Sequence, residues 1–173
     1  ILIGKNGQLG KSIRNLTKLN KHNHNFTFVG RETLDLSNDD NIQDYFENNE
    51  FDIIINCAAY TNVDKAEKEP EVANQVNHLA VSRLSQVANK LKAKLIHIST
   101  DYVFDGESNK PYLENDKTNP INTYGMTKLF GEQALLKIMP SNAMIIRTSW
   151  VYSEHGNNFV NTMLKNLCCF FII

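Results

Sequence analysis

The sequence begins ILIGKNGQLG at residues 1–10, where a short apolar segment runs into glycines at positions 4, 7 and 10. This Gly-x-x-Gly-x-x-Gly spacing, placed between a strand and a helix, allows a tight turn and lets backbone N–H groups approach a pyrophosphate. The N-terminus of the following helix, expected at about residues 8–19, adds positive potential for that anion. Gly4, Gly7 and Gly10 therefore predict a dinucleotide-binding turn.

Apolar strands alternate with amphipathic helices along the rest of the chain. Ile53–Ile55, for example, is apolar at every position, which is typical of a strand in a parallel sheet covered on both faces. The pattern predicts an α/β fold, a doubly wound parallel sheet of the Rossmann type, with residues 1–173 forming one NAD(P)-binding domain. We expect strands at residues 1–3, 26–29, 51–56, 94–99 and 143–147, and helices at 8–19, from a cap at Ser37 or Asn38 to 46, 70–91, 119–136 and 159–167.

Composition and charge exclude several classes of protein. Hydrophobic residues make up 42% of the chain, charged residues make up 21%, and the net charge is −1. This balance predicts no binding to nucleic acid or to an anionic membrane. Three cysteines in no metal-binding or disulfide pattern predict reduced thiols, a cytoplasmic location and no metal site.

Both ends of the sequence suggest a fragment. The chain starts inside a strand at Ile1–Ile3 without an initiating Met, and it stops within the apolar run Leu167–Ile173. That run is shorter than the roughly 20 residues that span a bilayer. We expect a domain truncated at its C-terminus, with an aggregation-prone tail, weak cofactor binding and no turnover on its own.

The residues that follow the second and third strands bear on the cofactor. Arg31 follows the second strand, where an arginine can accept the 2′-phosphate of NADPH, so NADPH is the expected cofactor and NADH the alternative. Ala58 and Ala59 follow the third strand, and their small side chains let a cofactor lie against the backbone.

The pattern Tyr124-x-x-x-Lys128 predicts the catalytic centre. A spacing of four places the phenol and the ammonium on one helical face, and a nearby ammonium is expected to lower the pKa of the phenol from about 10. Upstream, Thr100 leaves the fourth strand at its carboxyl end, where a hydroxyl can hydrogen-bond a carbonyl oxygen that is being reduced.

These motifs resemble the extended short-chain dehydrogenases/reductases and, among them, the dTDP-4-dehydrorhamnose reductase family. The resemblance rests on GKNGQLG (4–10), NCAAYTNVDKAE (56–67), STDYVFDG (99–106), NPINTYGMTKLFGE (119–132) and IIRTSWVY (145–152). It implies NADPH-dependent reduction of the 4-keto group of dTDP-4-dehydro-L-rhamnose, and a homodimer in the full-length protein. Family members are nearly twice as long, and their C-terminal part supplies much of the sugar-nucleotide pocket.

The resemblance also implies roles for individual residues. It implies a catalytic role for Thr100, Tyr124 and Lys128, and a sugar-nucleotide contact for Thr100, Asp101 and Trp150. The expected cofactor-binding residues, from the motifs and the resemblance together, are Gly4, Gly7, Gln8, Leu9, Gly10, Arg31, Asp35, Leu36, Ala58, Ala59, Tyr60, Tyr124 and Lys128.

Three alternatives share this fold. A sugar-nucleotide dehydratase would carry an Asp-Glu pair after the threonine, whereas Thr100 is followed by Asp101 and Tyr102. Another sugar-nucleotide epimerase or reductase is disfavoured only by the RTSWVY segment. A non-catalytic subunit that resembles the regulatory β subunit of methionine adenosyltransferase is disfavoured by the intact catalytic set.

Overall fold

A parallel sheet forms the centre of the molecule. The computed structural model describes residues 1–19 and 22–170, with the side chains of residues 167–170 outside that description. Within these residues the five strands lie in the order β2-β1-β3-β4-β5. Their bounds are Leu2–Ile3 (β1), Phe28–Val29 (β2), Ile53–Asn56 (β3), Lys94–Thr100 (β4) and Ala143–Thr148 (β5). The predicted α/β fold is confirmed.

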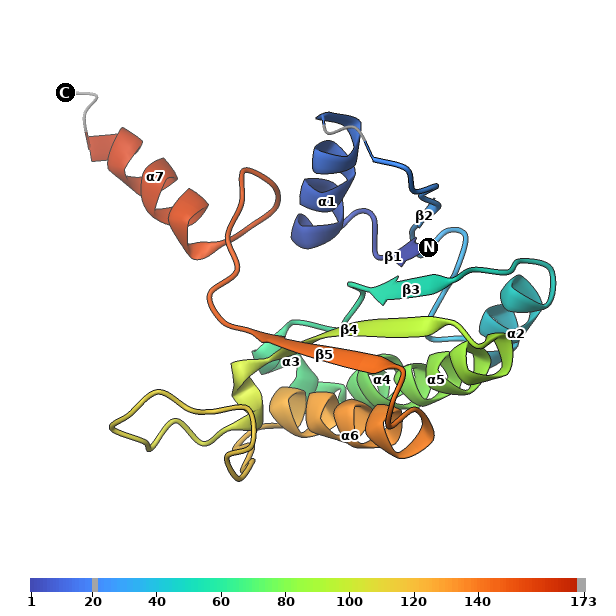
Figure 1. Ribbon diagram of the computed structural model, residues 1–173. Coiled ribbons are helices and arrows are strands. Elements are labelled where there is room, and N and C mark those ends of the chain that lie inside the picture. The colour runs from blue at the N-terminus through green and yellow to red at the C-terminus, as the bar shows by residue number, and fades with distance from the viewer. Residues whose placement is uncertain (20–21, 171–173) are drawn as a thin grey trace.

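Helices cover both faces of the sheet (Figure 1). α1 (Gln8–Leu19) lies above β1 and β3, whereas α2 (Asp39–Glu47), α5 (Ala80–Leu91) and α6 (Thr123–Ile138) lie on the opposite side. Two short helices, α3 (Val63–Lys68) and α4 (Pro70–Asn74), precede α5, and α7 (Phe159–Phe170) follows β5. The strand order reverses beside β1, and ligands of doubly wound sheets bind at such a point.

The core lies between the sheet and the lower helices. α5 buries Ala80, Val81, Leu84 and Ala88 at helical spacing against the strands. The upper face is less fully covered than the continuous apolar strands predicted, because α1 reaches only part of the sheet. Ile53, Met144 and Ile146 are therefore 41%, 56% and 40% exposed.

Several helices differ from the sequence prediction. α6 begins at Thr123 rather than near Asn119, because the Asn122 side chain accepts a hydrogen bond from the Gly125 amide at 2.8 Å and caps the helix there. The single helix expected at residues 70–91 is interrupted by a π-helical turn at Gln75–Leu79. α3 was not predicted.

The sequence predicts a polar turn at residues 20–25, of which residues 20–21 lie outside the described residues. The apolar run at residues 167–173 is described only as helical backbone, as far as residue 170. In the part of the chain that the structure describes, no helix combines the length and the apolar character needed to cross a bilayer.

Candidate active site

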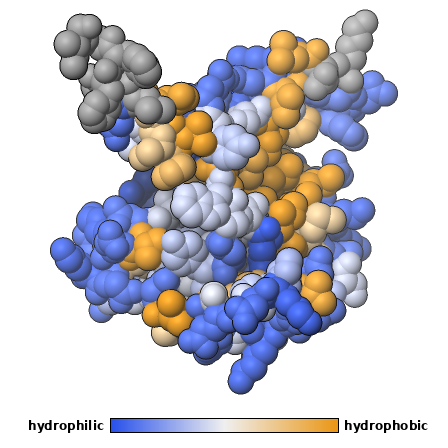
Figure 2. All heavy atoms as spheres, turned by 90° about the vertical axis from the view of Figure 1, so that its left-hand side faces the viewer, coloured by the Kyte–Doolittle hydropathy of each residue, from blue (hydrophilic) through white to orange (hydrophobic). Residues whose placement is uncertain are grey.

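A cleft of about 1160 Å³ opens along the carboxyl ends of the strands. It extends from the glycine turn and the end of β2, past the segment after β3, to β4, α6 and the segment after β5. Figure 2 looks onto this side of the molecule and shows a recess with hydrophobic side chains exposed within it. All the sequence-predicted site residues except Gly10 line this cleft, and Gly10 packs beneath the turn.

Gly4 and Gly10 let the first turn pack closely. Gly4 has φ +92°, and a Cβ there would lie 2.8 Å from the Ala58 nitrogen. A Cβ on Gly10 would clash with the Gly4 carbonyl oxygen. A Cβ on Gly7 would meet only that same oxygen, at 3.5 Å. Gly7 therefore leaves open space at the start of α1, where first-turn amides have no partner within the helix.

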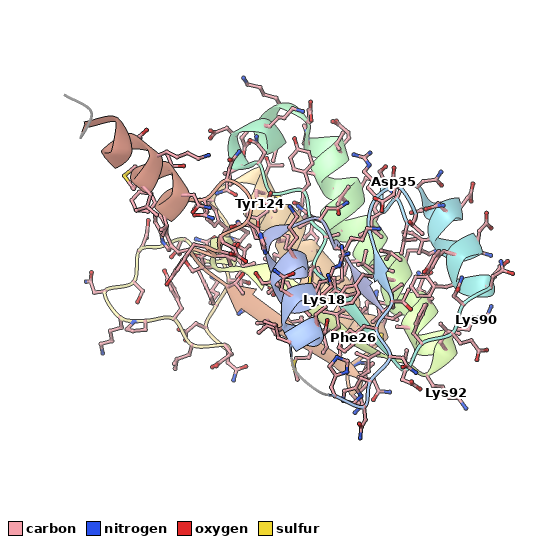
Figure 3. The ribbon with its side chains drawn as sticks, turned by 90° about the horizontal axis from the view of Figure 1, so that it is seen from above. Lys18, Phe26, Asp35, Lys90, Lys92 and Tyr124 are labelled. Carbon is pink, nitrogen blue, oxygen red and sulfur yellow. The ribbon has the colours of Figure 1, made fainter. Side chains whose placement is uncertain are left out.

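Arg31 lies on the rim of the cleft beside α2. Its side chain is 80% exposed, and its Nε donates to Asp35 Oδ2 at 3.1 Å. The Asp35 carboxylate also accepts bonds from the Ser37 amide at 2.9 Å and the Ser37 hydroxyl at 2.7 Å. Burial raises the pKa of Asp35, but the bonds from Ser37 and Arg31 outweigh it, and the pKa is lowered. Figure 3 shows Asp35 and Tyr124 well apart along this edge of the sheet.

Thr100, Tyr124 and Lys128 lie together at the α6 side of the cleft. Thr100 ends β4, and Tyr124 and Lys128 are one helical turn apart on α6. Tyr124 is 9% exposed, and its ring packs edge-on against Tyr102, with ring centres 5.5 Å apart. The structure thus brings a hydroxyl, a phenol and an amine to one wall.

The pKa of Tyr124 is raised, contrary to the sequence prediction. Burial is the largest cause, hydrogen bonding to Thr100 acts in the opposite direction, and the charge of Asp101 raises the pKa further. The Lys128 Nζ donates to the Ile98 carbonyl oxygen at 2.7 Å. The raised pKa keeps Tyr124 protonated at neutral pH, which is the state that a proton donor needs.

Lys128 is the largest fully buried polar side chain, with 1% of its surface exposed. Burial lowers its pKa to about 8, against the opposing charge of Glu132. Its Nζ also lies 3.3 Å from His97 Nε2. The amine therefore titrates much closer to neutrality than an ordinary lysine does.

Comparison with known proteins places the chain in a family. The model of the family described as the RmlD substrate binding domain matches residues 1–168. The chain belongs to this family. It is 42% identical to the dTDP-4-dehydrorhamnose reductase of Escherichia coli and 43% identical to that of Sinorhizobium fredii, with 95% and 94% of the chain covered.

Solved structures of RmlD-family proteins have the same fold. A dTDP-4-dehydrorhamnose reductase from Clostridium acetobutylicum superposes with a TM-score of 0.89 at 38% identity, over 95% of this chain and 57% of that one. One from Bacillus anthracis, solved in complex with NADP, has a TM-score of 0.88 at 39% identity, with the same coverage. The chain spans about half the length of the curated relatives it matches, 55% of the Escherichia coli protein and 53% of the Sinorhizobium one.

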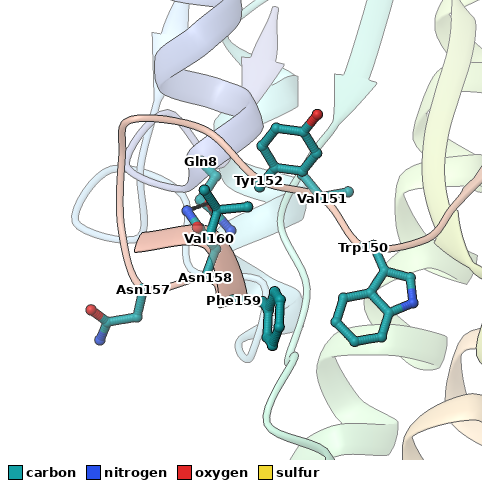
Figure 4. Close-up of a pocket in the computed structure, with 8 residues that line it drawn as sticks. All are labelled: Gln8, Trp150, Val151, Tyr152, Asn157, Asn158, Phe159 and Val160. Carbon is teal, nitrogen blue, oxygen red and sulfur yellow. Dashed lines mark hydrogen bonds between the residues drawn. The ribbon is translucent and has the colours of Figure 1, made fainter. Parts of the chain in front are cut away.

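In this RmlD-family chain Asp101 and Trp150 stand on the outer side of the cleft. Asp101 accepts hydrogen bonds from Thr100 Oγ1 at 3.1 Å and from Ser149 Oγ at 2.6 Å. Trp150 is 75% exposed and has φ +51°, a left-handed conformation that is strained for a bulky residue. Its ring packs edge-on against Phe159 beside a smaller hollow of about 260 Å³ (Figure 4).

Sequence reasoning missed Asn77, which holds the segment after β3 in place. Asn77 lies in the π-helical turn, is 1% exposed, accepts from the Tyr60 amide at 2.9 Å and donates to the Tyr60 carbonyl at 3.0 Å. It also donates to Thr127 on α6 at 3.2 Å. A π-helical turn has no simple signal in the sequence, so only the fold reveals that Asn77 joins the segment after β3 to α6.

A partly buried ion pair between α6 and β5 was also missed. Arg147 donates to Glu132 at 2.7 Å, and the Glu132 side chain is 2% exposed. The guanidinium also donates to the Glu114 carbonyl at 3.0 Å and lies over the Phe104 ring, 5.1 Å from its centre. The pair therefore fastens the loop after β4 to the wall that carries Tyr124.

The described residues hold no cluster of three or more His, Cys, Asp or Glu side chains placed to bind a metal. Burial raises the pKa of the Cys57 thiol to about 11, so this thiol is protonated at neutral pH and is a poor nucleophile.

Proposed function

We propose that this chain carries the cofactor-binding and proton-donating parts of an NADPH-dependent dTDP-4-dehydrorhamnose reductase. The observation that carries the proposal is the meeting of Thr100, Tyr124 and Lys128 on one wall of the cleft that begins at the glycine turn. The substrate follows from the relatives, which are named as reductases of dTDP-4-dehydrorhamnose.

The residues of the cleft fit a nicotinamide dinucleotide. Gly7 leaves space at the N-terminus of α1 for a pyrophosphate, and the exposed guanidinium of Arg31 stands at the rim, where it can meet a 2′-phosphate. Ser99 Oγ is buried in the cleft wall without a hydrogen-bond partner among the described residues. An orphaned hydroxyl of this kind is expected at a site that a ligand completes.

The chain's own residues would handle the proton and the carbonyl. NADPH, when bound, supplies the hydride for C4 of the sugar. Tyr124 gives its phenolic proton to the oxygen on C4, Thr100 orients that oxygen through its hydroxyl, and Lys128 holds the cofactor's nicotinamide ribose. Asp101 and Trp150, at the open side, would contact the sugar nucleotide.

The regulatory-subunit and epimerase alternatives make different predictions. We propose to follow NADPH consumption by the full-length protein that contains these residues, with dTDP-4-dehydro-L-rhamnose as substrate. Formation of dTDP-L-rhamnose with equimolar loss of NADPH supports the proposal. NADPH binding without any consumption would favour a regulatory subunit, and a changed sugar without net NADPH loss would favour an epimerase.

A further inference from the structure

A buried row of polar groups leads from the end of β3 to Lys128. Asn56 and His97 are paired in the register of β3 and β4, and neither side chain is exposed to solvent. Asn56 Nδ2 lies 3.2 Å from His97 Nδ1, and His97 Nε2 lies 3.3 Å from Lys128 Nζ. The proposed reaction uses Lys128 but assigns nothing to the other two residues.

The direction of the first bond is set by the backbone. The Ala58 amide donates to Asn56 Oδ1 at 3.1 Å, and because an amide N–H can only donate, the carbonyl end of the Asn56 side chain must face it. The NH₂ end of Asn56 then faces His97. His97 Nδ1 must accept that bond, so it carries no proton.

The second bond follows from the first. Burial and the charge of Lys128 hold the pKa of His97 well below its usual value, so the ring is neutral and has one proton. With Nδ1 unprotonated, that proton sits on Nε2 and points at Lys128 Nζ. An ammonium group has no acceptor, whereas a neutral amine can accept this bond and still donate to the Ile98 carbonyl.

We propose that Asn56 and His97 are positioning residues that weaken the hold of Lys128 on its proton, by presenting an imidazole N–H rather than a lone pair to its amine. Among the described residues, the charge that acts on Lys128 is Glu132, one turn further along α6, which is paired with Arg147 of β5. Glu132 acts in the opposite direction, whereas burial acts in the same direction as His97. Under the proposed function, on which this consequence rests, the pH profile of reduction would move with the titration of Lys128.

The tautomer can be measured directly in the 173-residue chain. We would record the ¹⁵N resonances of the His97 ring, identified by their loss in His97→Phe. We expect a protonated Nε2 and an unprotonated Nδ1. A proton on Nδ1 would overturn the proposal, and this measurement needs neither cofactor nor turnover, so its failure is distinct from failure of the proposed reductase activity.

Two substitutions at Asn56 separate the effect of the His97 tautomer on the Lys128 titration from the effect of an added negative charge. In Asn56→Asp both oxygens accept, one from Ala58 and one from His97 Nδ1–H, so Nε2 becomes an acceptor for the Lys128 ammonium. In Asn56→Leu no side-chain donor holds Nδ1 unprotonated. We expect each variant to raise the midpoint of the Lys128 ¹³Cε titration by about one pH unit or more.

Ser85→Ala provides the matched control, because Ser85 is also fully buried but, among the described residues, its hydroxyl bonds only to the Val81 carbonyl within its own helix. It should leave the Lys128 midpoint unchanged. If the Lys128 midpoint rises in Asn56→Asp alone, the cause is the added negative charge, and the proposal is overturned. The proposal is also overturned if the Lys128 midpoint rises in neither folded variant. Circular dichroism establishes which variants are folded. If neither Asn56 variant folds, the His97 tautomer measured in the wild type alone tests the proposal.

Discussion

Lys128 donates a 2.7 Å hydrogen bond to the backbone carbonyl of Ile98, which fastens the amine of α6 to the middle of the sheet. The bond explains how a lysine with 1% exposure is retained as a polar group in the core. It also fixes the place of the amine relative to Thr100, two residues further along β4.

Replacing Tyr124 by Phe tests the proton donor. The ring keeps its packing against Tyr102, but the proton is lost, so kcat of the full-length protein should fall by about 10²-fold or more. NADPH affinity should change little. Steady-state rates and a binding titration check both statements, and a near wild-type rate would mean that the proton comes from another group.

Replacing Arg31 by Ala tests the choice of cofactor. If the guanidinium meets the 2′-phosphate, NADPH binding should weaken relative to NADH by about 1.5–3 kcal/mol, the usual strength of a charged hydrogen bond. Binding titrations of the 173-residue chain with each cofactor measure this difference. Arg14→Ala, at an exposed position on α1 away from the cleft, is the matched control, and equal losses for both cofactors would show that Arg31 is not the discriminating residue.

Alanine at Gly10 and at Gly7 should have opposite consequences. Gly10→Ala places a Cβ against the Gly4 carbonyl and should lower the free energy of unfolding by about 1–3 kcal/mol, as other overpacked sites do. Gly7→Ala meets no close atom and should leave stability nearly unchanged, while its methyl group enters the pyrophosphate space and weakens NADPH binding. Urea denaturation and cofactor titration of both variants separate the two effects; equal NADPH affinity in Gly7→Ala would place the cofactor elsewhere.

Lys128 should make stability depend on pH. Its pKa is lowered from 10.5 to about 8 in the folded chain, so between these values the unfolded chain binds more protons and stability rises with pH. The destabilisation is fully present below about pH 8 and is relieved as the pH rises toward 10.5. The whole shift corresponds to about 3 kcal/mol.

Denaturation of the wild type and of Lys128→Met between pH 7 and 10 measures this contribution. The wild type should gain stability relative to the Met variant as the pH rises. Parallel curves for the two proteins would show that the Lys128 amine titrates as an ordinary lysine.

The sequence by itself determined the features that depend on neighbours along the chain. The glycine spacing at residues 4–10 predicted the turn, because Gly7 and Gly10 are constrained by the backbone of residues 4–5 within the same short segment. The four-residue spacing of Tyr124 and Lys128 predicted their shared helical face, because helical periodicity is local. The alternation of apolar strands with amphipathic helices predicted the layered sheet for the same reason.

Tertiary structure alone decided which groups meet across the fold. The raised pKa of Tyr124 depends on burial by distant segments, and the opposite sign predicted from spacing was wrong for this reason. The contact of Asn56 with His97 depends on the register of two strands, because the two residues are 41 positions apart in sequence. The hydrogen bond of Asn77 to Thr127 depends on a π-helical turn that packs against α6. Desolvation and hydrogen-bond direction are set by atoms that are close in space but remote in sequence, so no local pattern records them.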